Sequence, residues 1–167
     1  MHPSNLSEFP SPERVVFSVD DDPNDRLLLS HLLERPGLDY TCRFFPGGGE
    51  VMDALIKVLR GAPAPLACFL DLNMGRMSGF DVLRWIRCQD ALDAVPVIMM
   101  SSCEDPQKLH EAREMGAQCY VKKFPSAEEL HHIIEEAQHY ATDRSMPMAF
   151  HLPYNLLLNA VPHMAVA

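Results

Sequence analysis

The 167-residue chain has 22% charged and 47% hydrophobic residues, a composition typical of one water-soluble domain with a single core. Its formal net charge of −9 argues against a nucleic-acid-binding surface, because binding phosphates needs clustered lysine and arginine. No apolar stretch approaches the length of a membrane span, and the N-terminal sequence MHPSNLSEFPSPE lacks the basic and apolar regions of a secretion signal. The five cysteines are odd in number and show no C-x-x-C spacing, which favours reduced thiols over disulfides or zinc ligands. We therefore expect a cytoplasmic protein that binds neither nucleic acid nor membrane.

Short apolar runs alternate with helical patterns, after an N-terminal arm of residues 1–12 that carries three prolines and three serines. Strands are expected at residues 14–19, 40–45, 66–70, 95–100 and 118–121, with helices at 50–60, 80–88, 106–115 and 127–141 and a first helix that begins at Pro23. Five alternating β–α units predict a doubly wound α/β fold, a parallel sheet with helices on both faces. Periodicity alone does not give the order of the strands. Residues 13–142 form one domain in this interpretation, and residues 143–167 follow it as an extension.

The first helix has clear start signals. Asp22 can serve as its N-cap, Pro23 fits its first helical position, and Asp25 lies in its first turn. Four of its apolar positions follow helical spacing: Leu28, Leu29, Leu32 and Leu33. The Pro36-Gly37 pair ends the helix.

Acidic residues follow two of the predicted strands. The first strand ends in Asp20, Asp21 and Asp22, and the third ends in Asp71. Ligands gather at the carboxyl ends of parallel strands, and carboxylates brought together there would repel one another unless a hard cation lay between them. The sequence therefore predicts a magnesium site beside Asp71, an aspartate that can act as a nucleophile.

Ser101 ends the fourth strand, and Lys122 and Lys123 end the fifth. An acid pair, an acid, a hydroxyl and a lysine that close strands in this order resemble the receiver domain of bacterial two-component response regulators. The matching strings are VDDDPND, LDLNMGRMSGFDVLRWIR, VPVIMMSS and GAQCYVKKFPSAEEL, and they cover roughly residues 13 to 140. Asp71 and Ser101 are 30 positions apart, and Ser101 and Lys123 are 22 apart, both usual for the family. The resemblance implies a flavodoxin-like sheet with the strand order 2-1-3-4-5.

The resemblance also implies a role for each acid. Asp71 would be the phosphoacceptor, which forms an acyl phosphate; a loop acid that caps the next turn is the structural alternative. The ligands of Mg²⁺ would be Asp20, Asp21, Asp71 and the backbone carbonyl of Asn73. Asp22 fits a helix cap better and is left out of this set.

The hydroxyl, the lysine and one aromatic residue take their roles from the same resemblance. Ser101 would offer its hydroxyl to a phosphoryl oxygen, and Tyr120 matches the aromatic residue that follows this movement in receivers. A structural serine at a strand end and an aromatic ring packed on an edge strand are the alternatives. Lys122 and Lys123 point to opposite faces of a strand, and the match to the family assigns the site lysine to Lys123. Switching would then be a population shift driven by new charge-assisted hydrogen bonds.

Two positions depart from the family's pattern. Receivers usually have proline after the site lysine, often with a cis peptide bond, where this chain has Phe124 followed by Pro125. Because a non-proline cis bond costs about 3 kcal/mol, we expect a trans bond and a differently shaped loop. Receivers also commonly have proline four residues after the phosphoacceptor, where Gly75 leaves the loop more mobile.

The resemblance implies a phosphoacceptor signalling protein rather than an enzyme. It would take a phosphoryl group from the phosphohistidine of a sensor histidine kinase or histidine phosphotransfer protein and signal to a protein partner. Only about 25 residues follow the last helix, too few for an output domain, so we expect a stand-alone receiver. One alternative is an unphosphorylated interaction scaffold, although such proteins usually lack a site residue that this chain keeps. The other is an aspartate-nucleophile phosphohydrolase of the haloacid-dehalogenase kind, whose second acid would fall at Asn73.

Residues 143–167 are the least family-like part of the chain. They carry almost no charge after Arg144, an apolar cluster at residues 156–158, and prolines that oppose a long helix. We expect an interaction element that docks on its own domain or on a second copy of the chain, which would make a homodimer. A frayed tail is the alternative.

Overall fold

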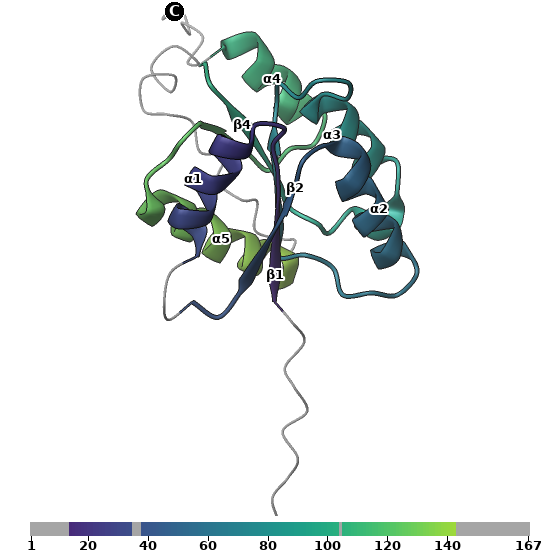
Figure 1. Ribbon diagram of the computed structural model, residues 1–167. Helices are drawn as coiled ribbons and strands as arrows, with labels where there is room; N and C mark the ends of the chain where they lie inside the picture. The colour runs from purple at the N-terminus through teal and green to yellow at the C-terminus, as the bar shows by residue number, and fades with distance from the viewer. Residues whose placement is uncertain (1–13, 35–37, 104, 143–167) are drawn as a thin grey trace, which may run out of the picture.

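The computed structural model describes residues 14–34, 38–103 and 105–142, which form one α/β unit (Figure 1). Five parallel strands lie in the order β2-β1-β3-β4-β5, which confirms the predicted fold class and strand order. The strands are β1 (Val15–Val19), β2 (Thr41–Phe45), β3 (Ala67–Asp71), β4 (Val97–Ser101) and β5 (Cys119–Lys122); the helices are α1 (Pro23–Leu33), α2 (Gly48–Leu59), α3 (Gly79–Arg87), the short η1 (Asp90–Leu92), α4 (Pro106–Glu114) and α5 (Ala127–Thr142). Within these ranges no helix has the length and apolar character needed to cross a membrane. The predicted N-terminal arm and C-terminal interaction element lie outside the described residues.

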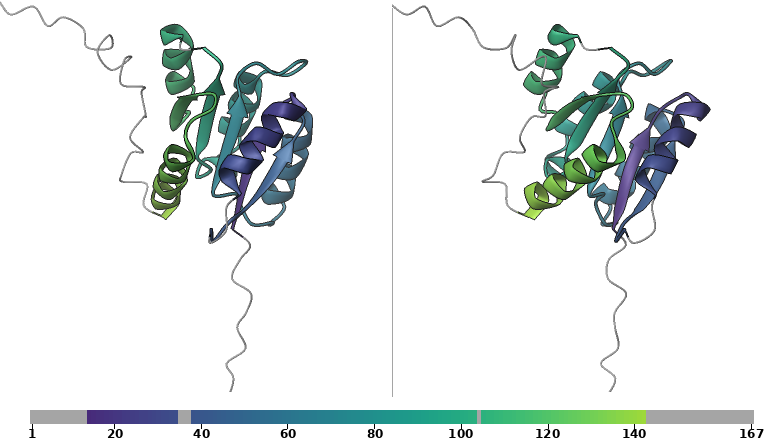
Figure 2. Two further views of the ribbon diagram at one scale, coloured as in Figure 1. Left: turned by 60° about the vertical axis from the view of Figure 1, so that its left-hand side comes forward. Right: turned by 90° about the vertical axis from the view of Figure 1, so that its left-hand side faces the viewer.

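Helices cover both faces of the sheet. Successive residues of a strand point to opposite faces, so β1 contributes Val16 to a core with α1 and α5, and Phe17 to a core with α2 and α3. The right-hand view of Figure 2 looks onto the first of these faces, where α1 and α5 lie in front of the sheet. Because both faces are covered, every residue of β3 and β4 is buried.

Apart from the short η1, which the sequence did not predict, the helices and strands begin and end within two residues of the predicted limits. Asp22 caps α1 as predicted, since its side chain accepts a hydrogen bond of 2.7 Å from the backbone N–H of Asn24. The leucines of α1 differ in burial, since Leu28 is 43% exposed whereas Leu29 and Leu33 are fully buried. The three consecutive leucines that begin at position 27 leave the rotation of this helix ambiguous in the sequence.

Arg87, the last residue of α3, holds the amino ends of two strands together. Its guanidinium donates to the carbonyl oxygens of Gly116 at 2.9 Å and Val95 at 3.0 Å, which precede β5 and β4. It also donates to the carbonyl oxygen of Leu92 at 3.4 Å and to Oε1 of Gln118 at 2.8 Å. The acidic residues lie at the opposite, carboxyl end of the strands.

Candidate functional site

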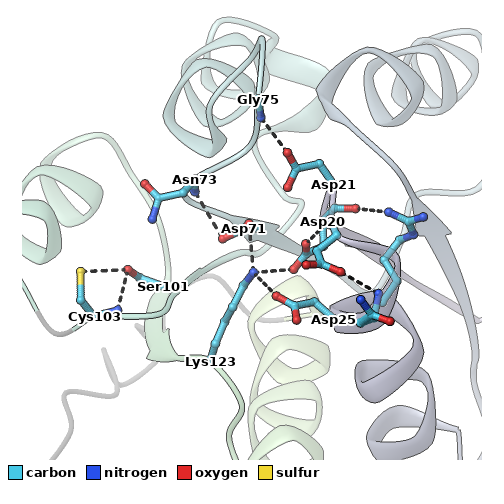
Figure 3. A network of polar contacts seen from close by, with 12 residues as sticks. Asp20, Asp21, Asp25, Asp71, Asn73, Gly75, Ser101, Cys103 and Lys123 are labelled. Carbon is cyan, nitrogen blue, oxygen red and sulfur yellow. Dashed lines mark hydrogen bonds and ion pairs between the residues drawn. The ribbon is translucent and has the colours of Figure 1, made fainter.

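The predicted site residues converge at the carboxyl ends of four neighbouring strands (Figure 3). Asp20 directly follows β1, Asp71 is the last residue of β3, and Ser101 is the last residue of β4. Lys123 directly follows β5, whose last residue, Lys122, pairs with Ser101. The parallel register thus places these groups side by side, although they come from four separate segments of the chain.

Three carboxylates form a compact acidic cluster. One oxygen atom from each of Asp20, Asp21 and Asp71 lies within 4.8 Å of the other two. Asp20 is fully buried and Asp71 is 2% exposed, so their mutual repulsion is poorly screened by water. Oδ2 of Asp20 is buried and lies against the ammonium of Lys123. Oxygen donors of this kind suit a hard divalent cation such as Mg²⁺, so the residues present fit the metal that the sequence predicts.

The ammonium group of Lys123 lies among three carboxylates. Its Nζ atom is 2.6 Å from Oδ2 of Asp20, 2.9 Å from Oδ2 of Asp25 and 3.0 Å from Oδ2 of Asp71. Burial alone would lower the pKa of Lys123, but its contacts with the three acids outweigh burial and raise the pKa above its usual value. Lys123 therefore stays charged at neutral pH.

Asp71 is held by contacts on both of its oxygens. Oδ2 faces Lys123, and Oδ1 accepts a 3.3 Å hydrogen bond from the backbone N–H of Asn73. Burial raises the pKa of Asp71, and the neighbouring charge of Asp20 adds to this effect, while Lys123 and the Asn73 N–H oppose it. The net direction is upward, so the folded chain disfavours the ionised form of this carboxyl group.

Ser101 is connected to Tyr120 through the backbone of Cys103. The fully buried hydroxyl of Ser101 accepts a 3.3 Å hydrogen bond from the Cys103 N–H. The Tyr120 hydroxyl donates to the Cys103 carbonyl oxygen at 3.3 Å, and Tyr120 is fully buried. The loop after β4 is therefore bonded on one side to the residue next to the acidic cluster and on the other to the edge strand β5.

The sequence matches the family model described as "Response regulator receiver domain" over residues 16–135. The chain belongs to this family. Among curated proteins, the receiver is 29% identical to the DNA-binding transcriptional regulator NtrC of Escherichia coli K12 over 133 residues, which are 80% of this chain and 26% of NtrC. It is 23% identical to the response regulator Rcp1 of Synechocystis over 132 residues, 78% of this chain and 90% of Rcp1. The match therefore spans about a quarter of NtrC but most of Rcp1.

Solved structures show the same fold. The chemotaxis protein CheY4 of Vibrio cholerae superposes with a TM-score of 0.63 at 26% identity, and the match covers 75% of this chain and 98% of CheY4. A Mn²⁺-bound form of Rcp1 superposes with a TM-score of 0.60 at 22% identity, and covers 84% of this chain and 99% of Rcp1. The second likeness supports the fold only.

Two features of this receiver differ from what the sequence suggested. The Lys123–Phe124 peptide bond is cis, so the expectation of a trans bond is wrong; the cost of a cis bond considered alone omits the tertiary surroundings of the loop. Gly75 donates its backbone N–H to Oδ2 of Asp21 at 2.9 Å. Proline, the residue common at this position, has no N–H to donate, so the glycine makes a contact with the acidic cluster that proline could not make.

Asp25 is the site residue that sequence reasoning missed. The first turn of a helix is a common place for an acid, so nothing singled out this one. Pro23 and the cap at Asp22 fix the start of α1, and the helix geometry then places Asp25 beside Lys123. The one signal in the sequence is the short separation between Asp25 and the acid pair at positions 20 and 21, which keeps Asp25 near the carboxyl end of β1.

Proposed function

We propose that this receiver accepts a phosphoryl group on Asp71 in the presence of Mg²⁺ and signals through a change in its surface. The observation that carries the proposal is the position of the Asp71 carboxylate, within the acidic cluster and 3.0 Å from the Lys123 ammonium. A carboxylate nucleophile, a cation site and a fixed positive charge are together the groups that phosphoryl transfer requires.

In the proposed reaction, an oxygen of Asp71 attacks phosphorus and forms a P–O bond. The P–N bond to the phosphohistidine of the donor breaks, and the leaving imidazole nitrogen keeps the electron pair. Asp20, Asp21, Asp71 and the Asn73 carbonyl would hold Mg²⁺, which offsets the repulsion between the acids and the incoming phosphoryl oxygens. Lys123 supplies a second positive charge to the new acyl phosphate.

The proposed signal begins at Ser101. A phosphoryl oxygen on Asp71 would accept a charge-assisted hydrogen bond from the Ser101 hydroxyl. The hydroxyl would move toward this oxygen and break its hydrogen bond with the Cys103 N–H. The populated conformations of the loop after β4 and of the Tyr120 side chain would then shift together. This polar chain supports the switch roles of Ser101 and Tyr120.

The proposed donor is a sensor histidine kinase or a histidine phosphotransfer protein, in the cytoplasm. The alternative of an interaction scaffold that is never phosphorylated is less well supported, because all of the predicted site groups converge. The phosphohydrolase alternative is less well supported because Asn73, two residues after Asp71, is an amide that cannot protonate a leaving group. We therefore expect only slow hydrolysis of the acyl phosphate, without turnover of an external substrate.

Phosphorylation by a small donor tests the proposal directly. The full chain, treated with acetyl phosphate and Mg²⁺, should gain the mass of one phosphoryl group, and this gain should disappear with EDTA or in Asp71→Asn. Beryllofluoride should bind under the same conditions. A phosphoryl group that is still incorporated in Asp71→Asn, or no incorporation in the wild type, would overturn the assignment.

A further inference from the structure

Lys123 has three carboxylate partners, and they belong to two different groups. Asp20 and Asp71 are members of the acidic cluster that fits a divalent cation, whereas Asp25 is not. In Figure 3, Asp25 approaches the ammonium from α1, on the side away from Asp21. Lys123 thus shares two of its partners with the metal site and keeps one outside it.

The ammonium and a bound cation would compete for the same oxygens. Lys123 contacts Oδ2 of both Asp20 and Asp71. The remaining oxygens already accept backbone hydrogen bonds, Oδ1 of Asp20 from the Asp22 N–H at 2.9 Å and Oδ1 of Asp71 from the Asn73 N–H at 3.3 Å. A cation that binds through the oxygens that face Lys123 competes with the ammonium for them, and at any position in the cluster it repels the ammonium as well.

Asp25 is the partner that can keep the ammonium in place when this happens. Its Oδ2 lies 2.9 Å from Nζ, and its side chain is 28% exposed, so the pair is only partly screened by solvent. α1 does not need this carboxylate as a cap, because Asp22 already supplies one. The Lys123 side chain is 6% exposed, and a buried ammonium without a partner would be costly.

We propose that Asp25 is a positioning residue that holds the Lys123 ammonium while a divalent cation occupies Asp20 and Asp71, and so strengthens cation binding. The inference rests on the proposed function, because it assumes that the acidic cluster binds the metal used in phosphorylation. Without the Asp25 charge, Lys123 keeps only the two acids that the cation also needs, and cation binding has to displace it.

The matched control is Asp22, another acid at the start of α1. It differs from Asp25 in that its side chain accepts the Asn24 N–H and forms no ion pair with Lys123. Asp22→Asn removes the same charge from the same helix end and keeps a residue that caps well. Any effect that comes only from the loss of a nearby negative charge should therefore appear in Asp22→Asn as well as in Asp25→Asn.

The test measures the binding of Mn²⁺ to the unphosphorylated full chain. The electron paramagnetic resonance signal of unbound Mn²⁺ gives the Kd. We expect Asp25→Asn to raise the Kd for Mn²⁺ about fivefold and Asp22→Asn to raise it less than twofold. In a Lys123→Met background, the effect of Asp25→Asn should shrink to that of Asp22→Asn, because no ammonium is left to hold. Thermal melting of each variant checks that the fold is kept.

The outcomes separate this inference from the proposed function. An equal effect of Asp25→Asn with and without Lys123, or no effect at all, overturns the role of Asp25 but leaves the metal site standing. Wild-type protein that binds no Mn²⁺ overturns both. A coupling between Asp25 and Lys123 that is absent for Asp22 supports the positioning role, because a merely structural or charge effect would not depend on Lys123.

Discussion

Gly79, the first residue of α3, packs directly against the carbonyl oxygen of Asp71. A Cβ at position 79 would overlap this oxygen and would lie 3.0 Å from the Cε of Met99. The Gly79 N–H also donates to the carbonyl oxygen of Leu72 at 3.2 Å. The proposed phosphoacceptor and the start of α3 are therefore fixed to each other through backbone atoms.

Replacing Gly79 with alanine should destabilise the fold. The new methyl group has to move backbone atoms of β3 rather than a flexible side chain, so we expect Gly79→Ala to lower the free energy of unfolding by about 2 kcal/mol. Urea denaturation measures this. Gly49→Ala is the matched control, because a Cβ at position 49 would extend into open space with no packing neighbour within 4 Å; it should be neutral or stabilising by up to about 1 kcal/mol.

Asp71→Asn should stabilise the protein at neutral pH. The folded state raises the pKa of Asp71, so the native protein binds this proton more tightly than the unfolded chain. Stability is then lost as the pH rises from the ordinary pKa of aspartate through the raised native value. Asparagine removes this loss, and we expect a gain of about 1 kcal/mol at pH 7. Thermal melts at a series of pH values should show that the stability gained by Asp71→Asn becomes smaller as the pH falls. A gain in stability that grows toward low pH would contradict a raised pKa for Asp71.

Lys123 and Lys122 should behave differently although they are adjacent. Lys123 is buried among three acids, whereas Lys122 is exposed. Lys123→Ala should slow phosphorylation by acetyl phosphate by tenfold or more, while Mn²⁺ binding is retained. Lys122→Ala should leave the rate within about twofold of wild type, as expected for an exposed position. Rates from intact-mass time courses compare the two, and the reverse order would refute the assignment of the site lysine.

Tyr120→Phe should lower the stability of the fold without changing the rate of phosphorylation. The substitution removes the hydroxyl that donates to the Cys103 carbonyl oxygen but leaves the ring in its core. We expect the free energy of unfolding to fall by about 1 kcal/mol, and the rate of phosphorylation to stay unchanged because Tyr120 does not contact Asp71. A large loss of phosphorylation in a folded variant would place Tyr120 in the chemistry itself.

The sequence predicted which residues lie together in the candidate site wherever those residues close a strand. Asp20, Asp71, Ser101 and Lys123 each close a strand, and parallel strands necessarily bring such residues to one edge. Asp25 could not be predicted in this way, since its approach to Lys123 depends on the direction in which α1 leaves the sheet. The exposure of Leu28 has a related cause, because a run of leucines does not define the rotation of a helix.

Two backbone features of the loops near the candidate site were not anticipated from the sequence. The expectation for the Lys123–Phe124 bond used only its local cost, and the structure has the cis form. The Gly75 N–H is a backbone donor, and a glycine in a sequence indicates freedom without indicating a partner. The donor leaves no side-chain pattern in the sequence, whereas the cis bond agrees with the cis bond that receivers often have after the site lysine.

Arg87 has a consequence for how this protein can vary. Its guanidinium satisfies uncharged acceptors at the amino ends of β4 and β5, whereas the groups of the proposed chemistry are crowded acids at the carboxyl ends. The amino end of the sheet thus carries stabilising hydrogen bonds, and the carboxyl end carries the proposed site. We expect substitutions around Arg87 to change the melting temperature without changing the electrostatics of Asp71, so resistance to unfolding and the proposed phosphoryl chemistry could vary independently within one domain.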